Sequence, residues 1–166
     1  MSYKGKKHPE TMVSEPMVAY VTEPHQHASF MSMLSGAKLS AKDANDWDIL
    51  KLTRQGLTKR VLLAMAKKIS LTLQEFAAIM HITERTFQRY DDNDVIRAEY
   101  SEKAIELARL YDRGEEVFGS IDKFKMWIRT PSIVFKGNTP LSLLDTSFGF
   151  DMVLNELGRI EHGIFA

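Results

Sequence analysis

Residues 73–90 read LQEFAAIMHITERTFQRY, and this stretch decides the fold class of the chain. Two runs of apolar residues at helical spacing flank a short break at residues 81–83. A helix-turn-helix crosses two helices steeply through a tight turn, so its inner positions must be apolar and one must be small. With Leu73 as the first position, the inner positions hold suitable residues: Phe76, Ala77, Met80, Ile82, Phe87 and Tyr90. The stretch therefore predicts a helix-turn-helix.

The turn of this motif usually holds a glycine, because the backbone there needs a positive φ. The corresponding residue in this chain is His81. A positive φ is uncommon for residues other than glycine, but histidine is among those that adopt it more often. We therefore expect His81 to take a positive φ in a strained or slightly reshaped turn.

The second helix of the motif carries side chains that suit DNA recognition. A recognition helix lies in the major groove with its N-terminal residues against base edges. Arginine pairs with guanine through two hydrogen bonds and glutamine with adenine, so Arg85, Gln88 and Arg89 are candidate base readers. Thr83 and Thr86 are candidates for contacts with phosphate.

The charges around the motif give conflicting indications about DNA binding. Arg60, Lys67 and Lys68 lie on one face of a preceding helix and could contact the DNA backbone. The sequence DDND at residues 91–94 follows the second helix, where negative charge opposes the helix dipole and repels phosphate. A structural helical hairpin with its charges in solvent therefore stays open beside a DNA reader.

Length and composition restrict the class of protein. The chain has 166 residues, of which 44% are hydrophobic, enough for one domain or two small ones with a packed core. It has no cysteine, which excludes disulfides and cysteine ligands and fits a reducing compartment. No apolar run approaches the roughly 18 residues of a spanning helix, and the N-terminus lacks a secretory pattern. We expect a cytoplasmic protein without a membrane partner.

The formal net charge is zero, but the charges are unevenly distributed. Residues 1–70 carry 11 Lys and Arg against 6 Asp and Glu, whereas residues 71–100 carry 3 against 6. A basic N-terminal part is a weak indication of contact with nucleic acid. On charge alone, ordinary solvated surface explains the distribution equally well.

Hydrophobic periodicity predicts an all-α chain. Residues 1–42 hold three of the five prolines and no sustained periodicity, so we expect a flexible tail there. From about residue 44 the pattern is helical, with Thr72, Thr83 and Ser101 as candidate N-caps. Gly114 is expected to weaken or end the long helix that follows Ser101. The last helix carries a clear apolar stripe: Phe150, Val153, Leu154, Leu157 and Ile160.

The residues do not predict a catalytic, cofactor or metal site. Glu161 and His162 are neighbours, and adjacent helical residues point about 100° apart, so they do not form an acid–base pair. His25 and His27 are two residues apart and cannot share one helix face as metal ligands. The sequence has no phosphate-cradling glycine loop and no nucleophile elbow. A small enzyme is the least favoured class.

The C-terminal end has the composition of a contact site. Arg159, Glu161 and His162 end an amphipathic helix, and two large apolar residues, Ile164 and Phe165, follow Gly163. These apolar side chains could fold back onto the core, or they could fill a pocket of a partner protein. An aromatic anchor in a desolvated pocket is a frequent hot spot of protein interfaces.

Five stretches in the last two-thirds of the chain carry a family resemblance: GL at 56–57, TERTFQRY at 83–90, VFGSIDKFKMWI at 117–128, GNTPLSLLDTSFG at 137–149 and LGRIEHGIFA at 157–166. In this order they resemble the antitoxins of the Xre/MbcA/ParS type, which are partners of RES-domain toxins. The resemblance runs from about residue 55 to the end, and residues 1–42 lie outside it. The family usually has two glycines before the TP pair, and Lys136 stands at the first of them.

The resemblance implies a division of labour that the residue pattern does not show. Residues 43–112 would form a Cro/repressor-like domain that dimerises, binds operator DNA and represses its own operon. Residues 113–166 would form a helical toxin-binding domain that blocks the active site of an NAD-depleting RES toxin. The toxin contacts would come from the end of the chain: Arg159, Glu161, His162, Gly163, Ile164, Phe165 and Ala166. A stand-alone helix-turn-helix transcriptional regulator is the alternative.

Overall fold

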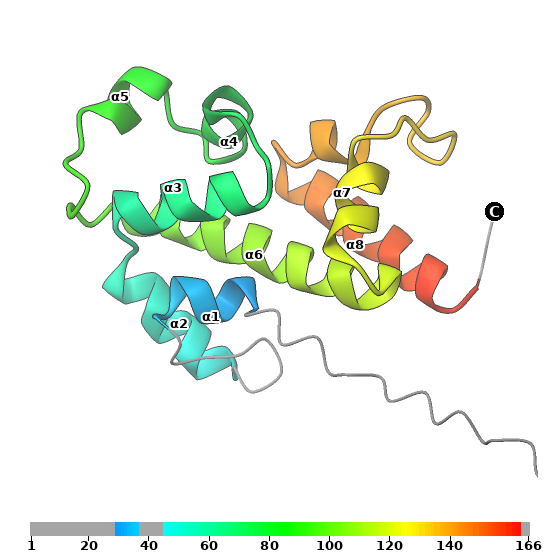
Figure 1. Ribbon diagram of the computed structural model, residues 1–166, viewed down its shortest axis with the longest axis horizontal. Helices are drawn as coiled ribbons and strands as arrows, with labels where there is room; N and C mark the ends of the chain where they lie inside the picture. Colours follow the sequence, from blue (N-terminus) through cyan, green and yellow to red (C-terminus); the bar gives the residue numbers. More distant parts are fainter. Residues whose placement is uncertain (1–28, 37–44, 164–166) are drawn as a thin grey trace, which may run out of the picture.

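The computed structural model describes residues 29–36 and 45–163, and the named elements in these two ranges are all helical (Figure 1). The helices, in chain order, are α1 (Phe30–Leu34), α2 (Asp46–Gln55), α3 (Lys59–Lys68), α4 (Leu73–Ile79), α5 (Glu84–Gln88), α6 (Ala98–Phe118), α7 (Ile121–Ile128), the 3-10 helix η1 (Pro140–Leu143) and α8 (Ser147–Glu161). The all-α prediction is confirmed. Within the described ranges, no helix is both long and apolar enough to cross a membrane.

Helix α6 packs against helices of both halves of the structure. It runs beneath the elements on both sides of the molecule, with α1 and α2 against one part and α7 and α8 against the other (Figure 1). Its inward face is almost completely buried and consists of Ala104, Ile105, Leu107, Ala108, Leu110 and Tyr111. The expected domain boundary after residue 112 falls inside this helix, which continues without a break to Phe118.

Two expectations about α6 are wrong, for reasons that lie in its neighbours. The helix begins at Ala98, so Ser101 is not its N-cap; the buried Ser101 hydroxyl instead accepts a hydrogen bond from the backbone N–H of Leu57 at 2.9 Å. Gly114 neither ends nor interrupts the helix. The ring of Phe124 occupies the space that a β-carbon at this position would need. Glycine at this position permits α6 and α7 to approach closely.

Helix α1 corrects the prediction of a tail as far as residue 42. The Asp112 carboxylate of α6 holds the start of α1, accepting hydrogen bonds from the Ser29 hydroxyl at 2.7 Å and from the backbone N–H groups of Phe30 and Met31 at 2.7 and 3.1 Å. Phe30, Met31 and Leu34 are buried. Burial raises the pKa of Asp112, while the three donors and nearby Lys68 oppose that shift. His25 and His27 lie outside the described residues.

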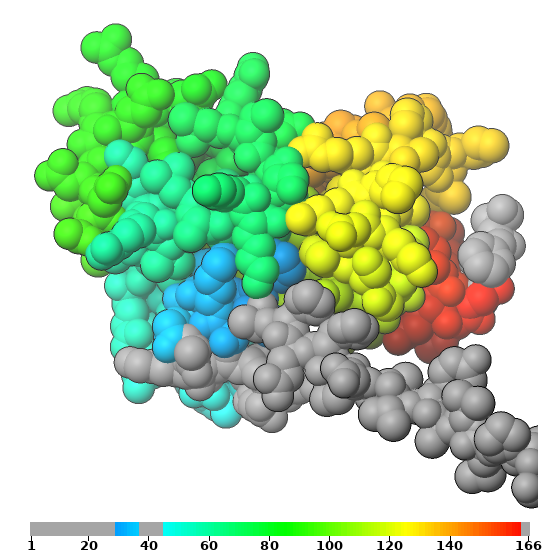
Figure 2. All heavy atoms as spheres, in the orientation of Figure 1, coloured from blue at the N-terminus to red at the C-terminus, as the bar shows by residue number. Residues whose placement is uncertain are grey.

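A bidentate ion pair connects the helix-turn-helix region to the C-terminal region. The Arg129 guanidinium, at the end of α7, donates to the two Glu75 carboxylate oxygens at 2.7 and 3.1 Å and to the Ser70 carbonyl at 2.7 Å. Glu75 also completes a capping box with Thr72 at the start of α4. Figure 2 shows the surrounding atoms of the two regions in contact where the colours change from green to yellow.

The pKa of Glu75 follows from this arrangement. The hydrogen bonds from Arg129, helped by those from Thr72 and opposed by partial burial, lower it from 4.5 to about 2. Because the pKa of the folded state is below that of the unfolded state, Glu75 stabilises the fold fully above about pH 4.5. This stabilisation is lost as the pH falls from there towards 2.

We predict that Glu75→Gln lowers the free energy of unfolding at pH 7 by about 1–2 kcal/mol, a value kept small because the pair is partly exposed to solvent. The difference in the free energy of unfolding between the two proteins should shrink as the pH falls towards 2.5, because Glu75 of the unsubstituted protein then stabilises the fold less. Urea denaturation at pH 7 and pH 2.5 measures both values. Glu102→Gln, at an exposed carboxylate of α6, is the control and should change little. An equal loss for Glu75→Gln at both pH values would contradict the role of the ion pair.

Candidate functional site

Helices α4 and α5 form the helix-turn-helix that the sequence predicts. Thr72 and Thr83 cap the two helices, and their hydroxyls accept hydrogen bonds from the backbone N–H groups of Glu75 and Thr86, each at 3.1 Å. His81 in the turn has φ 54°, so the expected left-handed conformation is confirmed. The left-handed backbone costs a non-glycine residue roughly 1–2 kcal/mol, which the surrounding packing must offset.

The inner positions of the motif are filled as expected. Phe76, Ala77, Met80, Ile82 and Phe87 are buried. The rings of Phe76 and Phe87 meet edge to face, with centroids 6.1 Å apart and planes inclined by 67°, and so fix the crossing of α4 and α5. Tyr90, the sixth inner residue, is only half-buried.

The candidate DNA readers are all exposed on α5 or at its ends. Arg85, Gln88 and Arg89 form no side-chain hydrogen bond or ion pair with the described part of the chain, so their polar groups remain available to a ligand. Thr83 and Thr86 are exposed, and the Thr83 hydroxyl donates a hydrogen bond to the Thr86 hydroxyl at 2.8 Å. Figure 1 shows α5 at the edge of the molecule, on the side of α3 and α4 away from α6. The side chains of Arg85, Gln88 and Arg89 are therefore accessible from solvent.

The upstream basic residues are less available. Arg60 is exposed, but its guanidinium donates a hydrogen bond to the side chain of Asn93. The Lys68 ammonium lies 4.6 Å from the centre of the Phe30 ring, a cation–π contact that holds α1. Lys67 is exposed at the end of α3. The structure therefore gives Arg60 and Lys68 internal roles that the sequence does not indicate.

The acidic run at residues 91–94 has a structural role. The carbonyl oxygens of Asp94 and Asp92 accept hydrogen bonds from the backbone N–H groups of Lys59 and Arg60, at 3.1 and 2.9 Å, at the start of α3. Lys59, which sequence reasoning missed, also donates from its ammonium to the Tyr90 carbonyl at 2.6 Å. The first turn of any helix leaves backbone N–H groups without partners. The loop after α5 satisfies them here, and Lys59 provides a cation at the C-terminal end of α5.

The predicted toxin-contact residues lie at the end of α8, as far as the structure describes them. Arg159 pairs with Glu156 of the same helix at 3.5 Å, and Glu161 pairs with Arg113 of α6. His162 is exposed, and Gly163 has φ 67°. The remaining predicted residues, Ile164, Phe165 and Ala166, lie outside the described residues.

Helix α8 presents a continuous exposed face that includes two of these residues. Phe148, Asn155, Arg159 and His162 are all exposed and follow one another at helical spacings of seven, four and three residues. Phe148 has 76% of its surface exposed, although an aromatic side chain of this size is usually largely buried. Sequence reasoning missed Phe148, although the apolar stripe from Phe150 to Ile160 leaves it on the opposite face of the helix.

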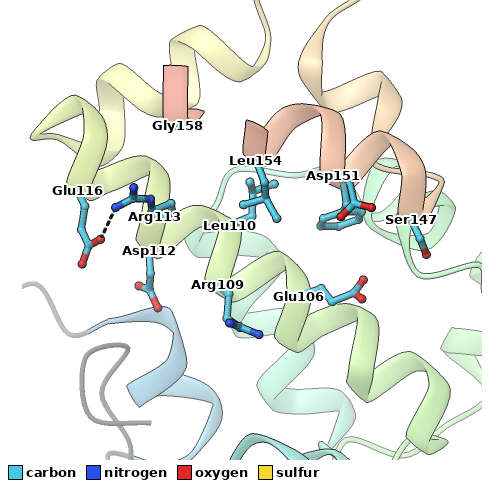
Figure 3. A pocket seen from close by; sticks show the side chains of 11 residues that line it. Glu106, Arg109, Leu110, Asp112, Arg113, Glu116, Ser147, Asp151, Leu154 and Gly158 are labelled. Atoms are coloured by element: carbon cyan, nitrogen blue, oxygen red, sulfur yellow. Dashed lines mark hydrogen bonds and ion pairs between the residues drawn. The ribbon is translucent and has the colours of Figure 1, made fainter. Parts of the chain in front are cut away.

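A groove of about 550 Å³ lies along the contact between α6 and α8 and is lined by residues of both helices (Figure 3). Charged residues of both signs line it around an apolar floor: Glu106, Arg109, Arg113, Glu116 and Asp151 with Leu110, Phe150 and Leu154. Leu154, which belongs to the expected apolar stripe, is 41% exposed and lines the groove. Among the residues that the structure describes, no group of three His, Asp or Glu could hold a metal ion.

The loop before η1 keeps its turn without the first of the two family glycines. Lys136 adopts φ 54° and Gly137 φ 83°, so both residues are left-handed. The segment 132–135 forms hydrogen-bonded turns. Thr139 caps η1, and Pro140 is at its first position, where the fixed φ of proline suits the start of a helix.

Comparisons with known proteins agree with these two regions in the same order. Residues 48–109 match the family model of the antitoxin Xre-like helix-turn-helix domain. Residues 113–163 match that of the antitoxin Xre/MbcA/ParS C-terminal toxin-binding domain. Neither match includes α1.

Three curated relatives carry the name antitoxin Xre. The protein from Photorhabdus laumondii is 38% identical over 68 residues, and the one from Yersinia enterocolitica is 37% identical over 70 residues. These alignments cover 40% and 41% of this chain and 46% and 47% of the relatives, so the chain spans about half the length of those two proteins. The protein from Pseudomonas putida is 25% identical over 148 residues, which is 89% of this chain and 92% of the relative. The chain belongs to the Xre/MbcA/ParS-type antitoxins, with a helix-turn-helix domain followed by a C-terminal toxin-binding domain.

Proposed function

We propose that the protein is the antitoxin of a type II toxin–antitoxin system and acts in the cytoplasm. Its C-terminal region binds an NAD-depleting RES-type toxin and blocks the active site, and its helix-turn-helix represses the operon that encodes both proteins. The observation that carries the proposal is the match of residues 113–163 to a toxin-binding domain whose last helix leaves 76% of the Phe148 surface exposed. The RES identity of the toxin rests on the resemblance of the sequence motifs alone.

The exposed face of α8 has the properties of an interface. Phe148 supplies a large apolar side chain with few rotamers, which loses little conformational entropy when a partner covers it. Arg159 and His162 add hydrogen-bond donors near the other end of the same face. The last residues, 164–166, follow directly after this face, and we propose that Phe165 extends it into the toxin.

The helix-turn-helix supports a second activity on the same protein. Arg85, Gln88 and Arg89 are exposed and not engaged with the described residues, which suits the reading of base edges in a major groove. Self-association of the N-terminal region would place two such helices on one operator. A stand-alone transcriptional regulator would need only this part, and the family match of residues 113–163 favours the antitoxin.

We predict that Phe148→Ala weakens toxin binding at least about tenfold, because it removes an aromatic anchor from the interface. The free energy of unfolding should stay within about 0.5 kcal/mol of the unsubstituted value, since the side chain is mostly exposed. The measurement is titration of the toxin encoded beside this protein, together with rescue of cell growth during toxin expression. Val95→Ala, at an exposed apolar residue of the helix-turn-helix region, is the control. Full affinity of the Phe148→Ala protein would exclude the exposed face of α8 as the contact.

We predict that the double substitution Arg85→Ala and Arg89→Ala lowers affinity for the upstream operator by about 100-fold or more, since each lost pairing with guanine costs about 1–3 kcal/mol. Neutralisation of the toxin should be unchanged. Fluorescence anisotropy with the upstream DNA and with a scrambled duplex separates specific from general affinity. Lys123→Ala removes an exposed cation on α7 and should leave both affinities nearly intact. If the double variant kept specific affinity, α5 would not be the reading helix.

A further inference from the structure

The groove between α6 and α8 has an apolar floor that no element of the described structure covers. Its volume of about 550 Å³ is within the range of pockets that hold a ligand. Leu110 and Phe150 form the floor, and Leu154 adds a side chain that is 41% exposed. Covering apolar surface of this kind is favourable, so the groove suits an extended apolar segment.

The described part of the chain begins beside this groove. Asp112, which lines the groove, accepts hydrogen bonds from the Ser29 hydroxyl and from the backbone N–H of Phe30. Figure 3 shows the Asp112 side chain directed from α6 towards α1. Residues 1–28 are therefore tethered at the groove, and a tether of this length gives an apolar segment a high effective concentration there.

One segment in that stretch has a suitable composition. Residues 17–21 read MVAYV and form the longest apolar run before Ser29. Pro16 directly precedes the run, and Pro24 follows it after two residues. Proline disfavours a helix at its own position and at the residue before it, so the sequence favours an extended segment here.

The lengths match as well. The part of α6 that lines the groove runs from Glu106 to Glu116, which is about 15 Å at the rise of a helix. The run at residues 17–21 spans about 16 Å when extended. Residues 22–28 connect it to α1 and can bridge about 26 Å, enough to reach either end of the groove. The three residues after Gly163 span only about 10 Å and are too short to turn back and fill it.

The charges of the groove also fit this segment. Arg109 and Asp151 make no hydrogen bond or ion pair with the described part of the chain, whereas the other charged residues that line the groove have partners within the protein. Glu23 is the single charged residue between the two prolines and can pair with Arg109. The hydroxyls of Tyr20 and Thr22 are donors that suit Asp151.

We propose that residues 17–24 lie in the α6–α8 groove of their own chain as an extended strap. The run at residues 17–21 covers the apolar floor, and Glu23 pairs with Arg109. The strap joins the α1 side of the protein to the toxin-binding region and lies beside the exposed face of α8 that contains Phe148. This inference does not depend on the proposed toxin or operator, and its test uses neither.

The test uses disulfide formation in the full-length protein, which has no cysteine of its own. Equilibration with glutathione gives the effective concentration of an introduced thiol pair. The groove pair is Tyr20→Cys with Leu154→Cys, and one control joins Tyr3→Cys to Leu154→Cys. Tether length alone would favour the groove pair about fivefold, since effective concentration falls as the −3/2 power of length. A docked strap should raise the ratio to about 50-fold or more.

Two further pairs test the position of the strap. Asp151→Cys provides a second groove position and should pair with Tyr20→Cys as readily as Leu154→Cys does. Val95→Cys, at an exposed residue of the helix-turn-helix region, should give an effective concentration at least about tenfold lower with the same Tyr20→Cys. Circular dichroism verifies that each variant folds.

A charge exchange tests the contact between Glu23 and Arg109. In the protein with the groove pair, Glu23→Arg or Arg109→Glu alone should lower the effective concentration about two- to fivefold, as expected for an exposed ion pair. The two substitutions together should restore it. A double variant that stays as low as the single variants would contradict this pairing.

Two other results would overturn the strap. A ratio near fivefold between the groove pair and the Tyr3→Cys control would show that residues 17–24 do not dock, which would leave the groove to a partner protein. Disulfide-linked dimers that increase with protein concentration would place the segment in the groove of a second copy. Toxin neutralisation by a protein that fails this test would leave the antitoxin function standing.

Discussion

The buried face of α6 is the constraint on which the rest of the structure depends. One helix of 21 residues supplies inward-facing side chains to the helix-turn-helix side and to the toxin-binding side alike. Tyr111, near its middle, meets Phe30 of α1 and Phe124 of α7 edge to face, with ring centroids 5.7 and 5.0 Å away. Because the two regions share α6, neither can lose its packing without exposing apolar surface of the other.

One further contact spans the same division, because Arg129 joins the end of α7 to the capping box of α4. On the helix-turn-helix side, Asp112 of α6 holds the start of α1. The proposed DNA-reading and toxin-contact surfaces would therefore belong to one cooperative body rather than to two independent domains. The family matches meet between residues 109 and 113, in the interior of α6, so a boundary between matches is not a boundary in the packing.

The sequence predicted those parts of the fold that local patterns determine. The helix-turn-helix positions, the capping box at Thr72 and the positive φ of His81 follow from spacing and residue type within a few residues. The sequence did not predict elements that depend on residues far away in the chain, such as α1. The five residues of α1 are too few to form a helix alone, and the carboxylate that caps them is 82 residues away from Phe30.

The same reasoning applies to the candidate sites. The exposure of Arg85, Gln88 and Arg89 follows from the motif register, whereas the internal partners of Arg60 and Lys68 depend on tertiary packing. The side chains at residues 91–94 indicate only repulsion of DNA. The structural role of this run comes from its backbone carbonyls, which accept hydrogen bonds from the start of α3 and which side-chain chemistry does not reveal. Phe148 is recognisable as a contact residue only once its exposure is known.

Native-state hydrogen exchange in low denaturant tests the central claim, that one body carries both regions, most directly. The measured quantity is the opening free energy of backbone amides in α3, such as Leu62 and Met65, and in α8, such as Val153 and Leu157. If α6 unites the two regions, these amides should converge on one opening free energy with one dependence on denaturant. Two separate values that stay apart, with amides of α8 exchanging through an opening that leaves α3 protected, would contradict the account.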